Sequence, residues 1–220
     1  MKYKVVEIFE SINGEGMKAG ELSVFIRFAG CNLCCGYCDT KWANETDAPY
    51  MEMELEEIVE RVQAYQVKNI TVTGGEPLLQ KGIAELLQLL SQKGFFVEVE
   101  TNGSVSLQEL AKNVPDVSFT MDYKLPGSKM EQKMNTENFM VLTAKDAVKF
   151  VVSDHLDLKR ALVVSQEYGL GGKCNILLSP VFEAIEPEEI VTFMKENHWT
   201  EARLQIQMHK VIWDPQKRGV

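Results

Sequence analysis

The stretch LEEIVERVQAYQVKNITVTGGEPLLQKGIAELLQLLSQKGFFVEVE, residues 55–100, decides the fold class. Apolar residues recur at helical spacing over 55–62 and again over 83–90, which predicts two amphipathic helices with one buried face each. Short apolar and β-branched runs at 69–73 and 95–100 follow these helices and predict two strands. Helices and strands that alternate in this way are typical of a parallel sheet covered by helices.

The same alternation continues on both sides of this stretch. Further strands are predicted at 4–9, 23–28, 117–121, 147–152, 175–179 and 203–208. Further helices are predicted to begin at a capping box at 106–109, near Asp154 and at Pro187. Because no repeat or linker interrupts the chain, the pattern predicts a single α/β domain over residues 1–220. Its sheet is expected to be mostly parallel and to form either an incomplete barrel or an open sheet.

Polar and glycine-rich segments follow three of the predicted strands, at 30–40, 74–77 and 101–103. In α/β folds ligands collect beyond the carboxyl ends of the strands, so these segments are expected to share one site. Residues 125–139 show no periodicity, and we interpret them either as a mobile loop over this site or as a plain surface excursion.

Composition and charge exclude several classes of protein. The 220 residues are 45% apolar and 25% charged, which is typical of a globular domain. The apolar runs are far shorter than the ~20 residues of a membrane span, and the first residues do not resemble a secretory signal. We therefore expect a cytoplasmic protein without a membrane segment. The net charge of −9 disfavours nucleic acid as a partner.

Four of the five cysteines fall within the run Cys31-Asn-Leu-Cys34-Cys35-Gly-Tyr-Cys38. Such crowding indicates metal binding or catalysis rather than disulfides, whereas an isolated cysteine such as Cys174 fits core packing. Thiolates at 31, 35 and 38 can hold three corners of a [4Fe–4S] cube. An electron-transfer cluster uses four thiolates, so three leave one iron open for a substrate-derived ligand.

Two other interpretations of the run remain open at this point. A structural zinc site could use Cys34 as its fourth ligand, but such sites normally pair two separated cysteine hooks, and no second hook exists here. A ferredoxin-like carrier would need Cys34 and its neighbour Cys35 at two corners of one cube, although adjacent side chains point differently. The catalytic cluster is the interpretation that we favour.

The spacing of Cys31, Cys35 and Cys38 resembles that of radical S-adenosylmethionine (SAM) enzymes. The turn Gly74-Gly-Glu-Pro77 resembles the motif of that superfamily that holds the methionine amino group of SAM. Further motifs look like those of the 7-carboxy-7-deazaguanine synthase family, namely EIFESINGEG (7–16), RFAGCN (27–32), CDT (38–40), TGGEP (73–77), ETNG (100–103) and QMHK (207–210). This resemblance runs from residue 7 to about 215.

The resemblance implies a radical SAM enzyme with an incomplete (β/α) barrel. Its family converts 6-carboxy-5,6,7,8-tetrahydropterin to 7-carboxy-7-deazaguanine and ammonia on the route to queuosine, after a 5′-deoxyadenosyl radical removes hydrogen from C6. The implied cofactors are a [4Fe–4S] cluster, SAM and Mg²⁺, and the implied partners are a second copy of the chain and an electron donor such as flavodoxin. The alternatives are another superfamily member, such as a glycyl-radical activase, and a non-catalytic iron–sulfur or zinc module.

The resemblance also implies roles for individual residues, with no catalytic residue beyond the cluster and SAM. The substrate-binding set is Ile12, Asn13, Gly14, Glu15, Arg27, Thr73, His209 and Pro215. The cofactor-binding set is Tyr37, Cys38, Asp39, Gly75, Glu76, Glu100, Asn102, Asp122, Tyr123, Lys124, Ser179, Pro180, Val181 and Phe182. The metal-binding set is Cys31, Cys35 and Cys38 for the cluster and Thr40 for Mg²⁺.

Several positions depart from the family pattern. Asn13 replaces a usual Gln, Asp122-Tyr-Lys124 replaces Ser-Pro-Lys, and Ser179-Pro180 replaces Gln-Pro. Some relatives end at the counterpart of Pro215, where the terminal carboxylate meets substrate, but residues 216–220 follow here. Two alternatives without a binding role remain open. Thr40 could only cap a short helix at 41–44, and His209, expected at a strand end, could be a hydrogen-bonded structural residue.

Overall fold

A computed structural model describes residues 1–45, 47–215 and 217–220. Its centre is a nine-stranded sheet in the order β3-β1-β2-β4-β5-β6-β7-β8-β9. The strands are β1 (Lys2–Ile12), β2 (Leu22–Phe28), β3 (Met51–Glu54), β4 (Asn69–Gly74), β5 (Phe96–Thr101), β6 (Ser118–Tyr123), β7 (Ala147–Val152), β8 (Asn175–Pro180) and β9 (Ala202–Leu204). All neighbours from β2 to β9 are parallel, while β1 runs antiparallel to β2 and β3. The predicted mostly parallel, incomplete barrel is confirmed.

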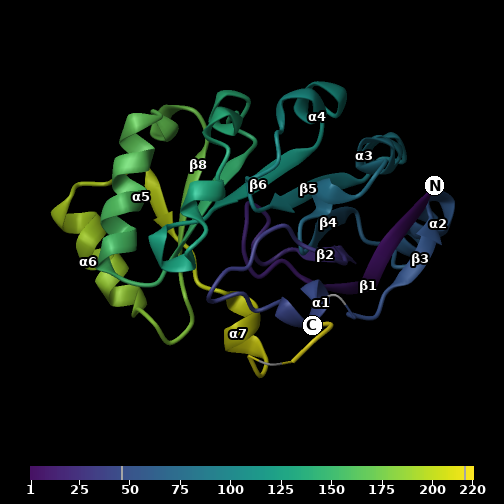
Figure 1. The fold of residues 1–220 in the computed structure, drawn as a ribbon, viewed down its shortest axis with the longest axis horizontal. Helices are drawn as coiled ribbons and strands as arrows, with labels where there is room; N and C mark the ends of the chain where they lie inside the picture. Colours follow the sequence, from purple (N-terminus) through teal and green to yellow (C-terminus); the bar gives the residue numbers. More distant parts are fainter. Residues whose placement is uncertain (46, 216) are drawn as a thin grey trace.

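The described residues form seven α-helices, and five of them form an outer layer around the curved sheet (Figure 1). The seven are α1 (Lys41–Asn44), α2 (Leu55–Gln63), α3 (Ile83–Gln92), α4 (Gln108–Asn113), α5 (His155–Glu167), α6 (Pro187–Glu196) and α7 (Met208–Ile212). Figure 1 shows α2 to α6 along the outside of the arc of strands, with α1, α7 and the C terminus on its inner side. The apolar faces predicted for α2 and α3 are buried, so the core lies between the sheet and this outer layer.

Two helix starts follow the predicted chemistry and one does not. The side chain of Asp154 accepts hydrogen bonds from the first N–H groups of α5, and α6 begins at Pro187. The capping box predicted at 106–109 is wrong, because α4 begins at Gln108 after Leu107 without a capping side chain.

The prediction missed β3 and extended the last strand too far. β3 has the sequence Met-Glu-Met-Glu and buries only Met53, so it carries little strand signal. The strand predicted at 203–208 ends at Leu204, and α7 follows. The cause is a long-range contact: the Gln205 amide exchanges two hydrogen bonds with the backbone of Gly16, at 2.8 and 2.9 Å, which draws the chain away from the sheet edge.

Residues 125–139 are packed rather than a plain surface excursion. They contain the short 3₁₀ turns Pro126–Ser128 and Glu131–Lys133, and a third begins at Thr136. Leu125 and Phe139 are fully buried. The carbonyl of Ser128 accepts a hydrogen bond from Gly36 N at 3.2 Å, so the segment supports the cysteine loop.

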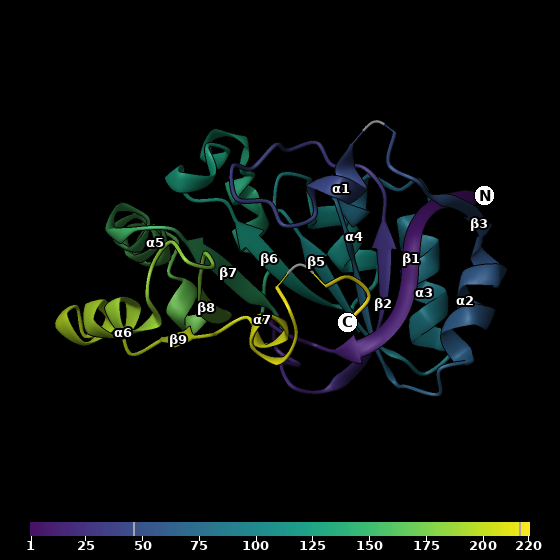
Figure 2. The ribbon, with the colours of Figure 1, turned by 90° about the horizontal axis from the view of Figure 1, so that it is seen from below.

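The two edge strands, β3 and β9, do not pair with each other, and α7 and the C-terminal residues lie over the inner face of the sheet (Figures 1 and 2). Figure 2 shows α7 and the C terminus across this inner face, close to β1 and β2. Of the described helices, none is both long and apolar enough to cross a bilayer.

Candidate active site

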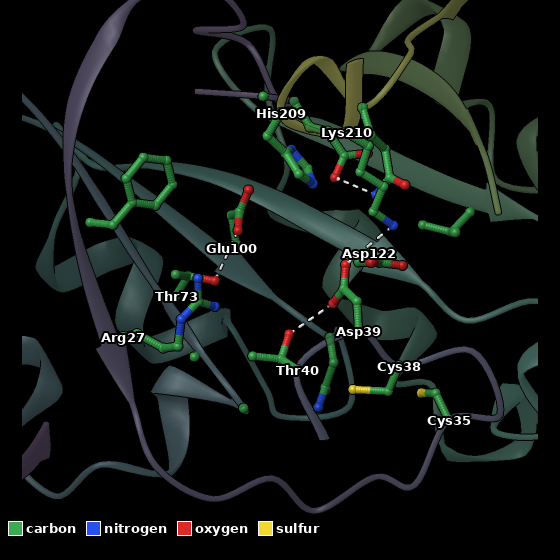
Figure 3. Close-up of a pocket in the computed structure, with 18 of the residues that line it drawn as sticks. Arg27, Cys35, Cys38, Asp39, Thr40, Thr73, Glu100, Asp122, His209 and Lys210 are labelled. Carbon is green, nitrogen blue, oxygen red and sulfur yellow. Dashed lines mark hydrogen bonds and ion pairs between the residues drawn. The ribbon is translucent and has the colours of Figure 1, made fainter. Parts of the chain in front are cut away.

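A cleft of about 330 Å³ lies on the inner face, where the carboxyl ends of the parallel strands meet. Most of the predicted site residues line it: Ile12, Asn13, Gly14, Glu15, Arg27, Cys31, Cys35, Tyr37, Cys38, Asp39, Thr40, Thr73, Gly75, Glu100, Asn102, Asp122, Lys124, Val181, Phe182, His209 and Pro215. Figure 3 shows ten of the lining side chains converging from β2, β4, β5, β6, the cysteine loop and α7. The four other predicted residues, Glu76, Tyr123, Ser179 and Pro180, lie outside this lining.

The cysteine loop presents three thiols to the cleft. Cys31, Cys35 and Cys38 line it, whereas Cys34 is exposed and does not. The loop is closed by a hydrogen bond from Cys38 N to Cys35 O at 3.4 Å. This arrangement agrees with the predicted ligand set and leaves Cys34 outside it.

Within the described residues, no three His, Cys, Asp or Glu side chains converge on one metal-ion position. Three thiols on one loop are the donor set of a [4Fe–4S] cluster with one open iron, and Cys31, Cys35 and Cys38 all line the cleft.

Burial and nearby donors act on these thiols in opposite ways. Burial raises the pKa of Cys35 to about 11 and also raises the pKa of Cys38. Bound iron reverses this preference, since a coordinated thiol is deprotonated. Two side-chain amides already face the sulfurs: Asn102 Nδ2 lies 3.6 Å from Cys31 Sγ, and Asn44 Nδ2 lies 3.9 Å from Cys38 Sγ.

The Gly74-Gly75-Glu76 turn is docked on the start of the cysteine loop. Gly75 N donates to Phe28 O at 3.1 Å, and Glu76 N donates to Gly30 O at 2.9 Å. A Cβ added to Gly75 would overlap Gly30 O and Asn44 Oδ1, so the approach admits only glycine. Turn and loop are thus one structural unit.

Glu76 lies behind the wall of the cleft and does not line it. It is fully buried and accepts hydrogen bonds from Asn102 N at 2.7 Å, Thr101 Oγ1 at 2.9 Å and Leu78 N at 3.0 Å. Burial raises its pKa even though these hydrogen bonds oppose the shift. The carboxyl group fixes the turn that carries Asn102 toward Cys31.

The other end of the cleft carries the predicted substrate groups. Arg27 donates from Nε to Glu7 Oε1 at 2.8 Å, and its guanidinium lies over the rings of Phe9 and Trp42 at 5.9 and 6.0 Å. Thr73 Oγ1 donates to Glu100 Oε2 at 2.9 Å. Among the described residues the terminal nitrogens of Arg27 have no carboxylate partner, so they can bind a ligand anion.

Asn13 also fits a polar ligand. Its Oδ1 accepts a hydrogen bond from Thr71 Oγ1 at 2.8 Å, while its buried Nδ2 has no partner in the described part of the chain. The side chain lines the cleft and is 2% exposed. A buried donor without a partner costs free energy unless a ligand or water satisfies it.

A buried charge network spans the middle of the cleft. Lys149 Nζ lies 3.3 Å from Glu15 Oε2 and 3.7 Å from Asp122 Oδ2, and Lys124 lies 2.9 Å from the same Asp122 oxygen. Ser179 Oγ donates to Glu15 at 2.6 Å, so Ser179 reaches the cleft indirectly. Burial raises the pKa of Glu15, but Lys149 and the hydrogen bonds outweigh it and bring the pKa to about 2.

The prediction missed Lys149 and Gln207, which also contacts Glu15 at 3.3 Å. For Lys149 a signal existed: it is the one charged residue in the otherwise apolar run Ala-Val-Lys-Phe-Val-Val of β7. A lysine buried in a strand needs a carboxylate partner. Tyr123 lies on the opposite face of β6, where it packs against Phe139 and Phe150.

The α7 segment closes the cleft from the C-terminal side. His209 lies in α7 rather than at a strand end, which corrects the prediction, and its ring lies against Gly14. Burial lowers the pKa of His209 despite nearby Glu15, so the neutral imidazole is favoured. Lys210 lies 3.7 Å from Asp39, on the far side of the opening.

Thr40 occupies the N-cap position of α1 but does not cap the helix with its side chain. Its side chain makes no capping hydrogen bond to α1 and instead donates to Asp39 Oδ1 at 2.8 Å. The nearby Lys210 ammonium and the hydrogen bond from Thr40 hold the pKa of Asp39 below its ordinary value. The capping alternative is therefore wrong, and Thr40 presents an oxygen to the cleft beside a carboxylate.

Comparisons with known proteins agree with this geometry. The model of the radical SAM superfamily matches residues 25–137, about half of the chain. A 7-carboxy-7-deazaguanine synthase from Clostridium acetobutylicum is 60% identical over the full length of both chains. One from Leptospira interrogans is 36% identical over 100% of this chain and 99% of its own. The crystal structure of QueE from Escherichia coli has a TM-score of 0.77 at 23% identity over 95% of each chain.

The fold, the three-cysteine loop and the superfamily match define a radical SAM enzyme. At 60% identity over its whole length, the chain belongs to the 7-carboxy-7-deazaguanine synthase family. This confirms the resemblance drawn from the motifs, and membership of the radical SAM superfamily carries with it the [4Fe–4S] cluster and SAM that the resemblance implied. The alternatives of a glycyl-radical activase and of a non-catalytic module do not hold.

Proposed function

We propose that this chain converts 6-carboxy-5,6,7,8-tetrahydropterin to 7-carboxy-7-deazaguanine and ammonia. The observation that carries the proposal is one cleft that contains both the three-cysteine loop and Arg27. When bound, the cluster and SAM supply a 5′-deoxyadenosyl radical for removal of the C6 hydrogen. The protein's own task is to hold the pterin at that radical in a fixed orientation and away from water.

The residues divide this task along the cleft. Cys31, Cys35 and Cys38 hold the cluster at one end, and the Gly74–Glu76 unit beside them positions SAM. Arg27 binds the substrate carboxylate at the other end, because a planar guanidinium can donate two parallel hydrogen bonds to it. Ile12, Asn13, Gly14, Glu15, Thr73, His209 and Pro215 complete the substrate side.

Thr40 would hold Mg²⁺ together with the substrate carboxylate, since its hydroxyl lies in the cleft lining. Magnesium keeps several waters and is usually held by few protein oxygens, so a single hydroxyl together with a substrate oxygen suffices. The Asp39 carboxylate, hydrogen-bonded to Thr40, supports this position electrostatically.

The remaining expectations concern the setting of the enzyme. We propose that residues 1–220 act as one domain, as supported by a single sheet from Lys2 to Leu204. We propose a homodimer and a flavodoxin-type electron donor on the family resemblance, and a cytoplasmic location on the sequence pattern described above.

The test is anaerobic turnover of the cluster-reconstituted protein with SAM, a reductant, Mg²⁺ and the carboxypterin. We expect 7-carboxy-7-deazaguanine, identified by mass spectrometry, and SAM that is not consumed in proportion to product. Release of 5′-deoxyadenosine without any deazapurine would contradict the proposed substrate while leaving the superfamily assignment intact.

A further inference from the structure

The last residues of the chain, 217–220, lie along the substrate end of the cleft. Lys217, Arg218, Gly219 and Val220 all line it, beyond Pro215. Both ribbon views place the C terminus on the inner side of the sheet (Figures 1 and 2). The tail therefore belongs to the site, although no motif pointed to it.

Trp42 of α1 connects the tail to the substrate arginine. The guanidinium carbon of Arg218 lies 4.2 Å from the centre of the Trp42 ring, and that of Arg27 lies 6.0 Å from it. Both distances are within the ~6 Å range of cation–π contacts. One indole ring thus holds two guanidinium groups at the same end of the cleft.

The balance of charge at this end is unusual. The other cations of the cleft each have a carboxylate: Arg27 has Glu7, Lys124 has Asp122, Lys149 has Glu15 and Lys210 has Asp39. Asp214 apart, no carboxylate of the described residues lies at ion-pair distance from Arg218 or Lys217. Cations gathered without counter-charges favour a ligand that brings one.

We propose that Arg218 is a second substrate-binding arginine, which acts with Arg27 on the carboxylate of the carboxypterin. Trp42 fixes its guanidinium, so that less side-chain entropy is lost when the ligand binds. Glu7 occupies only the Nε side of Arg27, and one carboxylate has lone pairs enough for donors from both arginines. This inference rests on the proposed function, because it names a further residue for the same substrate.

The test compares two ligands with the cluster-loaded enzyme in the presence of SAM and without reductant. One ligand is the carboxypterin, and the other is 6-methyltetrahydropterin, which lacks the carboxylate. Equilibrium dissociation constants are measured by anaerobic calorimetry for wild type, Arg218→Ala and Arg218→Lys. Arg203→Ala removes the same side chain from an exposed position on β9 and is the matched control.

Loss of a hydrogen-bonded charge partner should weaken binding of the carboxypterin by about tenfold or more in Arg218→Ala. The methyl analogue should bind equally to wild type and to this variant. Arg218→Lys should lie between the two, since it keeps the charge and loses the planar stack. Arg203→Ala should match wild type for both ligands.

Two results would overturn the inference: unchanged carboxypterin binding in Arg218→Ala, or equal weakening of both ligands, which would mean that the tail only supports the fold. Failure of the proposed function looks different. In that case wild type would neither bind the carboxypterin in preference to the methyl analogue nor form deazapurine.

Discussion

The two ends of the cleft are built in different ways. At the cluster end, the Cys31–Cys38 loop rests on the Gly74–Glu76 turn through backbone hydrogen bonds between neighbouring parallel strands. At the substrate end, α7 and the tail are held by contacts with residues far earlier in the chain, as in the hydrogen bond from Met208 N to Gly14 O and the contact of Arg218 with Trp42. A site formed by neighbouring strands and their loops can be recognised from short sequence motifs. A site formed by residues far apart in the chain cannot.

The largest expected effect of a substitution is at the cluster end of the cleft. Cys35→Ser should abolish cluster assembly, because it removes one of three ligands, while Cys34→Ser should keep iron content near wild type, because Cys34 is exposed and outside the cleft lining. Iron and sulfide analysis with the visible spectrum measures both. Loss of the cluster in Cys34→Ser together with its retention in Cys35→Ser would reverse the ligand assignment.

The charge network around Lys149, in the middle of the cleft, should contribute much of the free energy of unfolding. Lys149→Met leaves the largely buried Glu15 without its cation and Asp122 with Lys124 alone, which should lower the free energy of unfolding by about 3–5 kcal/mol. Anaerobic urea denaturation measures it. Lys112→Met, which removes an exposed pair with Glu109, is the control and should cost less than about 1 kcal/mol. Similar losses in both variants would show that the buried network has no special weight.

The buried carboxyl group of Glu98 has an unusual pKa and lies against Gly16, in the loop between β1 and β2. Glu98 accepts a hydrogen bond from Thr120, packs against Gly16 and faces Glu100 and Lys149. Burial raises its pKa from 4.5 to about 7. Between these pH values the folded state binds more protons than the unfolded state, so stability should fall as pH rises.

Glu98→Gln stays neutral at every pH and should remove this loss. We expect the variant to match wild type near pH 5 and to exceed it near pH 8, by up to roughly 3 kcal/mol. Thermal unfolding across this range measures the difference. Parallel pH profiles of variant and wild type would show that Glu98 does not titrate in this window.

The difference between the two ends of the cleft also explains which features the sequence could predict. Eight of the nine strands and the cleft at their carboxyl ends were readable from periodicity and turn residues, because local pattern reports which face is buried. The cysteine set and Gly75 were readable as motifs. His209 was placed on a strand that ends earlier, because the Gln205–Gly16 contact that ends it links distant residues. The Trp42–Arg218 contact left no pattern for the same reason.

The smallest expected effect tests whether the cluster end also serves the substrate through magnesium. Thr40 Oγ1 donates to Asp39 and does not cap α1, so Thr40→Ala should leave the helix and the visible cluster spectrum unchanged. Loss of one neutral oxygen ligand should raise the magnesium requirement and the apparent KM for the carboxypterin together, by roughly two- to tenfold.

Thr40→Ser keeps the hydroxyl and should stay near wild type. Mn²⁺ is expected to rescue any residual defect, because its oxygen site is less exacting than the near-ideal octahedron of Mg²⁺. Titration of Mg²⁺ against deazapurine formation in both variants decides the matter. If Thr40→Ala keeps the wild-type metal dependence, or if wild type keeps full activity in excess chelator, the metal does not bind at Thr40.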